Sequence, residues 1–470
     1  MSIFVGIDIG TSSIKILVLN SNLEVESTRS SQVDIEVSSN GLIVFKPEAV
    51  LSVIRSEIDR LISIYSSEIY IGLSCHSPSL VLLDNSGNPL ESIIWLDDRA
   101  KVEVGELKEL ISEEEMYLRT GLRSSPLFFP PKIMWIRKHR PGLFEKVRWI
   151  VQLKDYVFYK LTGQPYTDYS TASETQLYNL LREHYDEYIL SILDISEDML
   201  FNPRYSHEHF EYVGSSRVKI ALGGVDSVMA ALGSGVISEG EASIVAGSSA
   251  CWDFPVNKPI LDLNKGFEEY FHVVPNKYVA EGCLPTAGLA SDKVRELMDL
   301  VLEDVNESRI RENPSGIIFM PFLHGTRTPD WNSRVKGLLY GLTISTSRED
   351  IYKSVFEGIA YWSREIVELI RELGIQIRDV VASGGLTRSK LFNKILASVL
   401  KLSVKTLEIS DVSAYGAALI AAISSGILHF NNVKEVVRIS EIYDPGKYVE
   451  LYEKLYHEYR VLKNFIMSFN

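Results

Sequence analysis

The chain contains 470 residues, 46% of them hydrophobic and 23% charged, and carries a net charge of −14 at pH 7. A single hydrophobic core rarely grows beyond about 250–300 residues, so this length predicts two packed domains, and the apolar fraction excludes global disorder. The negative balance argues against nucleic acid or an anionic membrane as the main partner, because both require a basic surface.

The first half of the chain opens with strands and then alternates helix and strand. Apolar and β-branched residues predict strands over 3–9, 14–19 and 25–33. Apolar residues spaced by three and four predict a helix over 47–64, and a buried strand follows over 69–73. This order is typical of a mixed sheet covered by helices.

The second half repeats this plan. Strands are predicted over 218–222, 242–246, 252–255, 278–281 and 379–382, and helices over 351–373, 390–400 and 414–424. Small residues form a turn at 10–13 in the first half and at 247–250 in the second. The repetition predicts a duplicated nucleotide-binding fold with a cleft between the halves and a boundary near Gly223.

The cysteines and the N-terminus bear on the cellular compartment. Cys75, Cys251 and Cys283 are too few and too scattered for a disulfide framework or a thiolate metal site, so reduced thiols in a cytosol are expected. The N-terminus lacks the features of a signal peptide, and no apolar run approaches the ~20 residues of a membrane helix. We therefore expect a cytoplasmic protein with no membrane partner. The sequence leaves a homodimer open.

The first candidate functional segment surrounds the turn at 10–13. Backbone amides and hydroxyls in such a turn can wrap phosphate oxygens, and Asp8 before it could hold a magnesium ion through water. Lys15 supplies a cation in the next strand. An ordinary hairpin with an exposed lysine is the alternative.

The second segment is Gly223-Gly224-Val225-Asp226, which precedes an Ala-rich helical run. Paired glycines allow a sharp turn, and Asp226 then stands where the helix begins. An aspartate at this position is either a helix N-cap or a general base that takes a proton from a substrate hydroxyl. The segment alone does not decide between them.

The third segment, 383–389, joins a strand to a helix through Gly384-Gly385, where a nucleotide can approach the backbone. It is not the dinucleotide fingerprint, since Gly-x-Gly-x-x-Gly is absent from the chain. The P-loop pattern is absent too, which disfavours a P-loop enzyme.

In this order the segments resemble the FGGY family of carbohydrate kinases, and the resemblance covers nearly the whole chain. The turn at 10–13 is similar to the family's first phosphate motif, Gly247-Ser248-Ser249 to its second, and 383–389 with 414–418 to its adenosine motif. Further matching segments are 95–99, 154–156, 161–163, 167–173, 321–329 and 357–360.

The resemblance implies an α/β fold of two actin-like ATPase (RNase H-like) domains with an interdomain cleft. An N-terminal domain over 1–222 would bind the sugar and carry the first phosphate turn. A C-terminal domain over 223–470 would carry the base, the second phosphate turn and the adenosine site. The implied reaction is ATP-dependent phosphorylation of a small-molecule sugar or polyol, with ATP and Mg²⁺ as cofactors.

The resemblance also implies roles for individual residues, according to their positions in the matching motifs. Asp226 falls on the family's catalytic base, and Asp8 with Asp226 on its metal site. The implied nucleotide-binding residues are Gly10, Thr11, Ser12, Ser13, Lys15, Gly247, Ser248, Ser249, Gly288, Gly384, Gly385, Leu386 and Ser389. The implied substrate-binding residues are Ser77, Pro78, Trp95, Asp97 and Asp226.

The substrate is less well determined. Ser77-Pro78 stands where xylulose-phosphorylating members carry Met-His and glycerol kinases carry Arg-Glu. Leu127 or Phe128 replaces an aromatic residue of glycerol kinases, so a ketose such as xylulose is favoured, with gluconate or glycerol as alternatives. His76 nearby is expected to be an exposed loop residue. A catalytically unproductive nucleotide-binding regulator and an actin-like ATPase are the alternatives outside the kinases.

Overall fold

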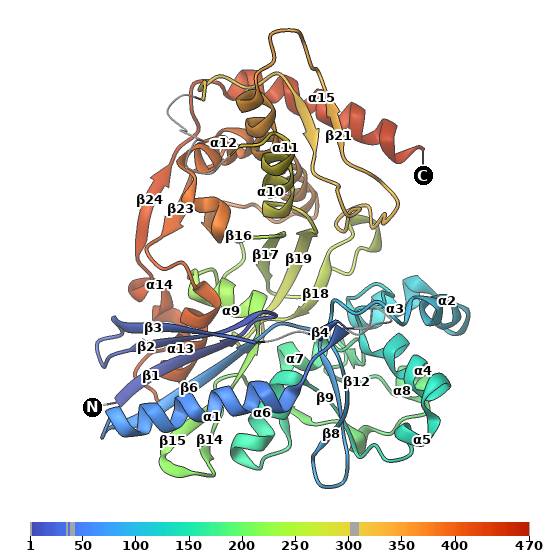
Figure 1. Ribbon diagram of the computed structural model, residues 1–470, viewed down its shortest axis with the longest axis vertical. Coiled ribbons are helices and arrows are strands. Elements are labelled where there is room, and N and C mark those ends of the chain that lie inside the picture. The colour runs from blue at the N-terminus through green and yellow to red at the C-terminus, as the bar shows by residue number, and fades with distance from the viewer. Residues whose placement is uncertain (1, 34–35, 38–42, 301–309, 470) are drawn as a thin grey trace.

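The computed structural model describes residues 2–33, 36–37, 43–300 and 310–469, which build two lobes around two mixed sheets (Figure 1). The first sheet has the strand order β14-β15-β6-β1-β2-β3. Its strands are β1 (Ser2–Ile9), β2 (Ser13–Leu19), β3 (Val25–Gln32), β6 (Glu68–Cys75), β14 (His209–Tyr212) and β15 (Ser215–Val225). The strands predicted in the first half are confirmed; the aliphatic residues of β1, β2 and β6 lie in the core, whereas Val25 in β3 is exposed.

The second sheet has the order β18-β19-β17-β16-β22-β23-β24. Its strands are β16 (Glu241–Ala246), β17 (Ala250–Val256), β18 (Glu268–Phe271), β19 (Tyr278–Leu284), β22 (Asp379–Ser383), β23 (Val404–Leu407) and β24 (Ile439–Tyr443). In both sheets an antiparallel meander, β1-β2-β3 or β16-β17-β19, is extended by a parallel strand beside its first member, β6 or β22. The predicted duplication is confirmed.

The remaining strands form small separate sheets. They are β4 (Glu36–Val37), β5 (Ile43–Val44), β7 (Leu80–Leu83), β8 (Pro89–Ile93), β9 (Trp149–Gln152), β10 (Tyr166–Asp168), β11 (Tyr178–Asn179), β12 (His184–Tyr185), β13 (Asn202–Arg204), β20 (Ile318–Met320) and β21 (Leu338–Tyr340).

The helices agree closely with the predictions from apolar spacing. Those predicted over 47–64 and 390–400 are α1 and α12 with these bounds. The helices of the first half are α1 (Pro47–Ile64), α2 (Lys101–Leu110), α3 (Glu113–Thr120), α4 (Phe129–His139), α5 (Pro141–Phe144), α6 (Leu153–Thr162), α7 (Tyr169–Ser173) and α8 (Glu187–Leu193). Those of the second half are α9 (Asp226–Gly233), α10 (Gly288–Leu297), α11 (Arg348–Glu372), α12 (Lys390–Leu400), α13 (Val412–Ser424), α14 (Val433–Val436) and α15 (Val449–Met467).

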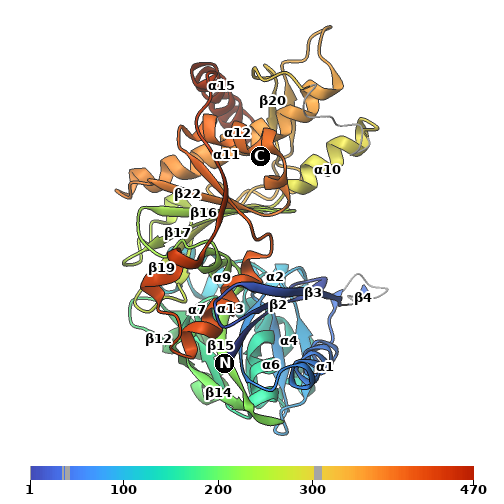
Figure 2. The same ribbon diagram turned by 90° about the vertical axis from the view of Figure 1, so that its left-hand side faces the viewer.

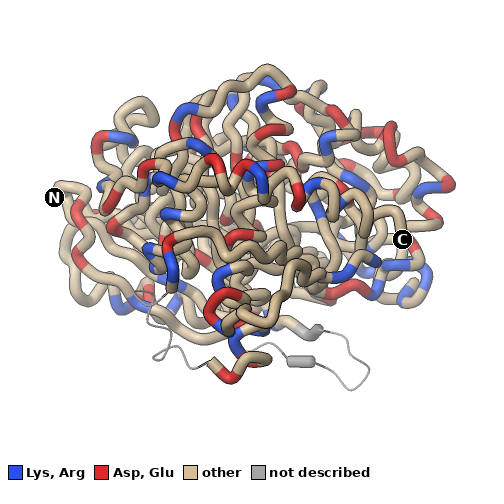
Figure 3. The backbone as a smooth tube through the Cα atoms, turned by 90° about the horizontal axis from the view of Figure 1, so that it is seen from above, with Lys and Arg blue, Asp and Glu red and all other residues tan. Residues whose placement is uncertain are grey.

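The surface carries both signs of charge. Seen from above, basic and acidic residues are interspersed along the chain (Figure 3). Within the described ranges, none of the helices combines the length and apolar character that crossing a bilayer would require.

Helix α13 joins the two lobes. It follows β23 of the second sheet, yet it packs against β1 and β6 of the first sheet and against α9. Figures 1 and 2 both show it within the lower lobe, whereas α12 and α15 lie in the upper lobe. Nearly every residue of α13 is buried, which is why its sequence is almost entirely small or apolar.

Glycines allow this close packing. A Cβ atom at Gly6 of β1 would lie 1.8 Å from the carbonyl oxygen of Ala414, and one at Gly72 of β6 would lie 2.0 Å from that of Ala417. On the other side of α13, a Cβ at Gly416 would lie 1.9 Å from the carbonyl oxygen of Met229 in α9. The helix therefore approaches its neighbours backbone to backbone, so Gly416 in the adenosine-like segment serves packing.

The paired glycines before Asp226 form a bulge within a strand and not the predicted turn. Strand β15 pairs with β6 as far as Val225, with a register shift between Ala221 and Gly224. Gly223 has φ +74°, which a glycine adopts readily. The boundary at 222/223 thus falls inside β15, and the domain limits 1–222 and 223–470 remain a proposal.

The expectation of reduced thiols is wrong for two of the three cysteines. Cys251 and Cys283 form a disulfide between β17 and β19, while Cys75 is free and buried. The two residues are separated by 32 positions in the chain but are direct cross-strand partners. Only the register of the sheet brings them together.

A glycine-to-alanine pair tests the packing of α13. We expect Gly416→Ala to destabilise the protein by about 1–3 kcal/mol or more, because no rotamer can move a Cβ away from the backbone of Met229. The control Gly105→Ala makes the same change inside exposed helix α2, where nothing lies within 4 Å, and should stabilise by up to about 1 kcal/mol. Denaturant unfolding measures both; equal effects would contradict the packing argument.

The disulfide can be tested by counting thiols. We expect one reactive thiol per chain in denaturant, Cys75, and three after treatment with a dithiol reductant. Closing a loop of this length stabilises the fold by roughly 3–4 kcal/mol in the chain-entropy model, so Cys283→Ser should lower the unfolding midpoint. Three thiols in the unreduced protein would disprove the bond.

Candidate active site

The predicted acidic residues meet where three strands of the first sheet end. Asp8 in β1 lies beside Ser74 in β6, and Ser74 lies beside Gly224 in β15. Because these strands are parallel, their carboxyl ends share one edge, and α9 begins there with Asp226. The buried Asp8 carboxylate accepts a hydrogen bond of 2.7 Å from Ser74 Oγ.

The carboxyl group of Asp226 has a perturbed acidity. Burial, the charge of Asp8 and the charge of Glu281 together raise its pKa to about 8. The N-cap of α9 is Val225 and not Asp226, and Asp226 Oδ1 accepts a hydrogen bond of 3.0 Å from the adjacent amide of Ser227. The helix-capping alternative is therefore wrong, and the carboxyl group lies beside other acids at the junction of the two halves.

Lys15, which was predicted to supply a cation beside the phosphate-like turn, forms an ion pair within the protein. Its Nζ lies 2.7 Å from Asp411 Oδ1, the residue that precedes α13. Lys15 is also the cross-strand partner of Asp8, and its charge lowers the pKa of that carboxyl against the larger effect of burial. The lysine thus links the sheet edge that carries Asp8 to the helix that joins the lobes.

The first phosphate-like turn, Gly10 to Ser13, is held in shape from two sides. The amide of Gly10 donates to the carbonyl of Ser13 at 2.9 Å. The indole of Trp95, predicted to contact substrate, donates to Thr11 Oγ1 at 3.1 Å. Ser12 between them is exposed, and its carbonyl accepts a hydrogen bond of 3.0 Å from the amide of Val33.

Asp97, the other acid predicted in this segment, is buried and engaged with a neighbour. Its two oxygens accept hydrogen bonds from the guanidinium group of Arg99, at 2.9 and 2.6 Å. The pair shapes the loop that carries Trp95.

The second turn, Gly247 to Ser249, is assembled with residues distant in sequence. The Gly288 amide at the start of α10 donates to the carbonyl of Gly247 at 2.9 Å. Gly384, with φ +93°, packs so closely that a Cβ there would lie 2.6 Å from the carbonyl of Ala246. The structure therefore brings three predicted nucleotide segments together around one turn.

One of the last residues of the adenosine-like segment has a structural role in capping a helix. Ser389 Oγ caps α12 by accepting the amide of Phe392 at 3.0 Å. Leu386 is half-buried and Gly385 is exposed, with nothing within 4 Å of a Cβ placed on it.

The predicted sugar segment lies in the first lobe. Ser77 Oγ donates to Gln152 Oε1 at 3.0 Å, and Pro78 is buried. His76 is buried and not an exposed loop residue: its Nδ1 lies 2.9 Å from Ser79 Oγ, and burial lowers its pKa to about 4. It is therefore neutral at pH 7.

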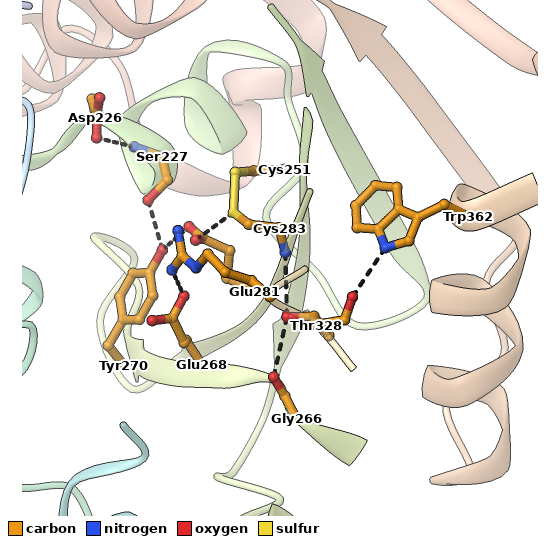
Figure 4. The surroundings of a disulfide bond; sticks show 11 residues. Asp226, Ser227, Cys251, Gly266, Glu268, Tyr270, Glu281, Cys283, Thr328 and Trp362 are labelled. Carbon is orange, nitrogen blue, oxygen red and sulfur yellow. Dashed lines mark hydrogen bonds and ion pairs between the residues drawn. A yellow bond between two sulfur atoms is a disulfide. The ribbon is translucent and has the colours of Figure 1, made fainter. Parts of the chain in front are cut away.

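Several residues of this region escaped the sequence-based prediction. Ser227 Oγ lies 2.6 Å from the hydroxyl of Tyr270, which in turn donates to Glu281 Oε2 at 2.5 Å. Glu281 Oε1 lies 2.9 Å from the sulfur of Cys283. Figure 4 shows this chain running from Asp226 to the disulfide. An acid inside the buried strand β19 was the available signal, because buried carboxylates are rare without a role.

The acids at this edge fit a divalent cation. Oxygen ligands suit Mg²⁺, and the mutual repulsion of Asp8 and Asp226 would be relieved by a cation between them.

Comparison with known proteins agrees with this geometry. The model of the FGGY family of carbohydrate kinases, N-terminal domain, matches residues 3–233, and that of its C-terminal domain matches 242–425. A xylulose kinase of Staphylococcus xylosus is 27% identical, with 98% of this chain and all of that protein covered. A gluconokinase of Bacillus subtilis is 25% identical over 93% of this chain and 90% of its own length.

Among solved structures, a ligand-bound xylulose kinase from Lactobacillus acidophilus superimposes with a TM-score of 0.93 at 22% identity, covering 99% of both chains. This likeness shows the fold, and the expectation of two actin-like domains is confirmed.

Proposed function

The chain belongs to the FGGY family of carbohydrate kinases and is a sugar kinase; from this premise we propose that it phosphorylates a ketose such as xylulose, with Asp226 as general base. The observation that carries the base assignment is the position of Asp226. It begins α9 at the shared edge of β1, β6 and β15, next to Asp8 and between the two lobes.

In this proposal Asp226 takes the proton of the attacking sugar hydroxyl. A neutral alcohol is a weak nucleophile, and a carboxylate whose pKa is raised toward neutrality is a stronger base than an ordinary aspartate. The raised pKa thus suits the role, since the group still ionises near physiological pH. The proton moves to the carboxylate as the oxygen attacks phosphorus.

The remaining parts bind and orient the phosphates. The turns at 10–13 and 247–249 offer backbone amides and hydroxyls from opposite lobes, so closure of the lobes would exclude water from the reacting groups. Asp8 and Asp226 would hold Mg²⁺, which when bound supplies positive charge that neutralises the phosphate oxygens.

The substrate assignment rests on relatives and on the sugar segment. Xylulose kinases are prominent among the relatives, while gluconokinases match at similar identity and keep gluconate as an alternative. Ser77-Pro78 lacks the Arg-Glu pair of glycerol kinases, which disfavours glycerol. The regulator and ATPase alternatives are set aside, because the chain is a sugar kinase of the FGGY family.

The base assignment is tested by Asp226→Asn, with exposed Asp59→Asn on α1 as the control. We expect the first variant to lose at least about 10²-fold in kcat for sugar phosphorylation while still binding ATP, because the amide cannot accept the proton. The control should retain full activity. Turnover is measured by a coupled assay of ADP release over a panel of ketoses, polyols and sugar acids. Near-normal turnover of Asp226→Asn would show that Asp226 is not the general base.

The acidity of the base predicts a pH dependence. Since the protonated carboxyl cannot act as a base, kcat/KM should rise with pH through the pKa of Asp226 and level off above it. Glu281→Gln removes a negative neighbour, lowers that pKa and should move the rise to lower pH. Profiles of both proteins at one fixed magnesium concentration provide the comparison; a shift to higher pH, or none, contradicts the coupling.

A further inference from the structure

The two bonded cysteines share one face of the second sheet with an acid. Cys251 on β17 and Cys283 on β19 are direct cross-strand partners, and Glu281 lies two residues before Cys283 on the same face of β19. Glu281 Oε1 lies 2.9 Å from the sulfur of Cys283, as Figure 4 shows. One ligand atom from each of the three side chains lies within 4.8 Å of the others. The register of the sheet thus gathers metal-binding groups that the cysteine spacing in the sequence did not indicate.

The carboxyl group of Glu281 is held in place through its other oxygen. Oε2 accepts a hydrogen bond of 2.5 Å from the hydroxyl of Tyr270, and that hydroxyl lies 2.6 Å from Ser227 Oγ at the start of α9. These contacts keep Oε1 directed at the sulfur of Cys283 (Figure 4). Metal ligands in proteins are commonly oriented by a second hydrogen-bonding group in this way.

A second buried acid beside this cluster has no partner. Asp253 stands directly opposite Glu281 and lies two residues beyond Cys251, on the same face of the sheet. It is fully buried, and neither of its oxygens has a hydrogen-bond partner within the part of the chain that the structure describes. Buried polar groups nearly always have a partner in folded proteins. The free oxygens of Asp253 therefore indicate a group that binds next to Glu281.

Two sulfur atoms and one carboxylate oxygen suit zinc. Thiolates select zinc and other thiophilic ions over Mg²⁺, and zinc with three protein ligands takes a water as its fourth. Zinc–ligand bonds of about 2.0–2.3 Å place the ligand atoms roughly 3.3–3.8 Å apart, so side-chain rotations are enough to close the cluster around an ion. Cys251 is partly exposed, which gives a reductant and then an ion a direction of approach, whereas Cys283 is buried.

The site requires reduction, because sulfur atoms that are bonded to each other are not thiolates. A dithiol reductant transfers two electrons to the S–S bond and is itself oxidised to a disulfide, while each protein sulfur takes up a proton. Zn²⁺ then forms two S–Zn bonds and one O–Zn bond to Glu281. The thiol protons, and that of Glu281 where it is protonated, pass to solvent.

The cysteines lie where their strands lead into the second phosphate-like turn. Cys251 follows the turn at 247–249 by two residues. The backbone amides of residues 287–289, shortly after Cys283, donate hydrogen bonds of 2.9, 2.9 and 3.1 Å to carbonyl groups of the turn. A link between the two strands therefore acts on both segments that shape this turn.

We propose that Cys251, Cys283 and Glu281 form a redox-gated zinc site, which clamps β17 to β19 when the disulfide is reduced. The oxidised protein holds the same strands by the covalent bond. The inference does not rest on the proposed function, since neither the sugar nor the role of Asp226 enters it.

The test measures zinc binding to the full chain in both redox states. The protein is reduced with a dithiol, which is then removed by desalting under anaerobic conditions. Zn²⁺ affinity is obtained by competition with a chromophoric chelator, and Co²⁺ serves as a spectroscopic probe. Excess Mg²⁺ in every sample competes for sites made of oxygen ligands only, such as Asp8 with Asp226. The variants are Cys283→Ser, Glu281→Gln and the control Cys75→Ser, which removes the free thiol.

We expect the reduced wild type and Cys75→Ser to bind one Zn²⁺ per chain with equal affinity. The oxidised wild type and Cys283→Ser should bind at least about 100-fold more weakly, and reduced Glu281→Gln at least about 10-fold more weakly. Co²⁺ should give a thiolate-to-metal charge-transfer band only with the reduced protein. Zn²⁺ should also raise the thermal midpoint of the reduced wild type and not that of Cys283→Ser. Circular dichroism establishes that each sample is folded.

Four results would overturn the inference. They are equal zinc affinity of the oxidised and reduced wild type, wild-type affinity in reduced Cys283→Ser or Glu281→Gln, a Co²⁺ spectrum without the charge-transfer band, and an unchanged thermal midpoint of the reduced protein with zinc. Sugar phosphorylation is not a readout, so a failure of the proposed function leaves this test intact.

Discussion

The backbone contact between α13 and the first sheet is the constraint on which the rest of the structure depends. Gly6 and Gly72 remove the side chains that would keep this helix away from β1 and β6, and Gly416 does the same toward α9. A helix from the second half is thereby locked onto the first. Since α9 begins with Asp226 and packs on α13, the position of the proposed base follows from glycines that touch no ligand.

The same contact organises the charges at the sheet edge that carries Asp8 and Asp226. Asp411 precedes α13 and pairs with Lys15, whose cross-strand partner is Asp8. Asp8 is thus held close enough to Asp226 for its charge to add to the effect of burial in raising the pKa of the Asp226 carboxyl. An acidic protein that binds a polyanionic nucleotide must do so with local groups, and here the turns at 10–13 and 247–249 offer amides and hydroxyls in place of a basic surface.

In our proposal, each lobe contributes different groups to the active site. The first supplies the edge with Asp8 and the sugar segment around Ser77, and the second adds the turn from Gly247 to Ser249.

The sequence by itself determined the parts whose signals lie between near neighbours. Apolar spacing located α1 and α12, runs of β-branched residues located β1, β2 and β16, and the motif order identified the family. It did not reveal the Cys251–Cys283 bond, the Lys15–Asp411 pair or the burial of His76. Each of these depends on strand register or on packing between segments distant in the chain. Such contacts are selected by the whole fold, and only the tertiary structure decides them.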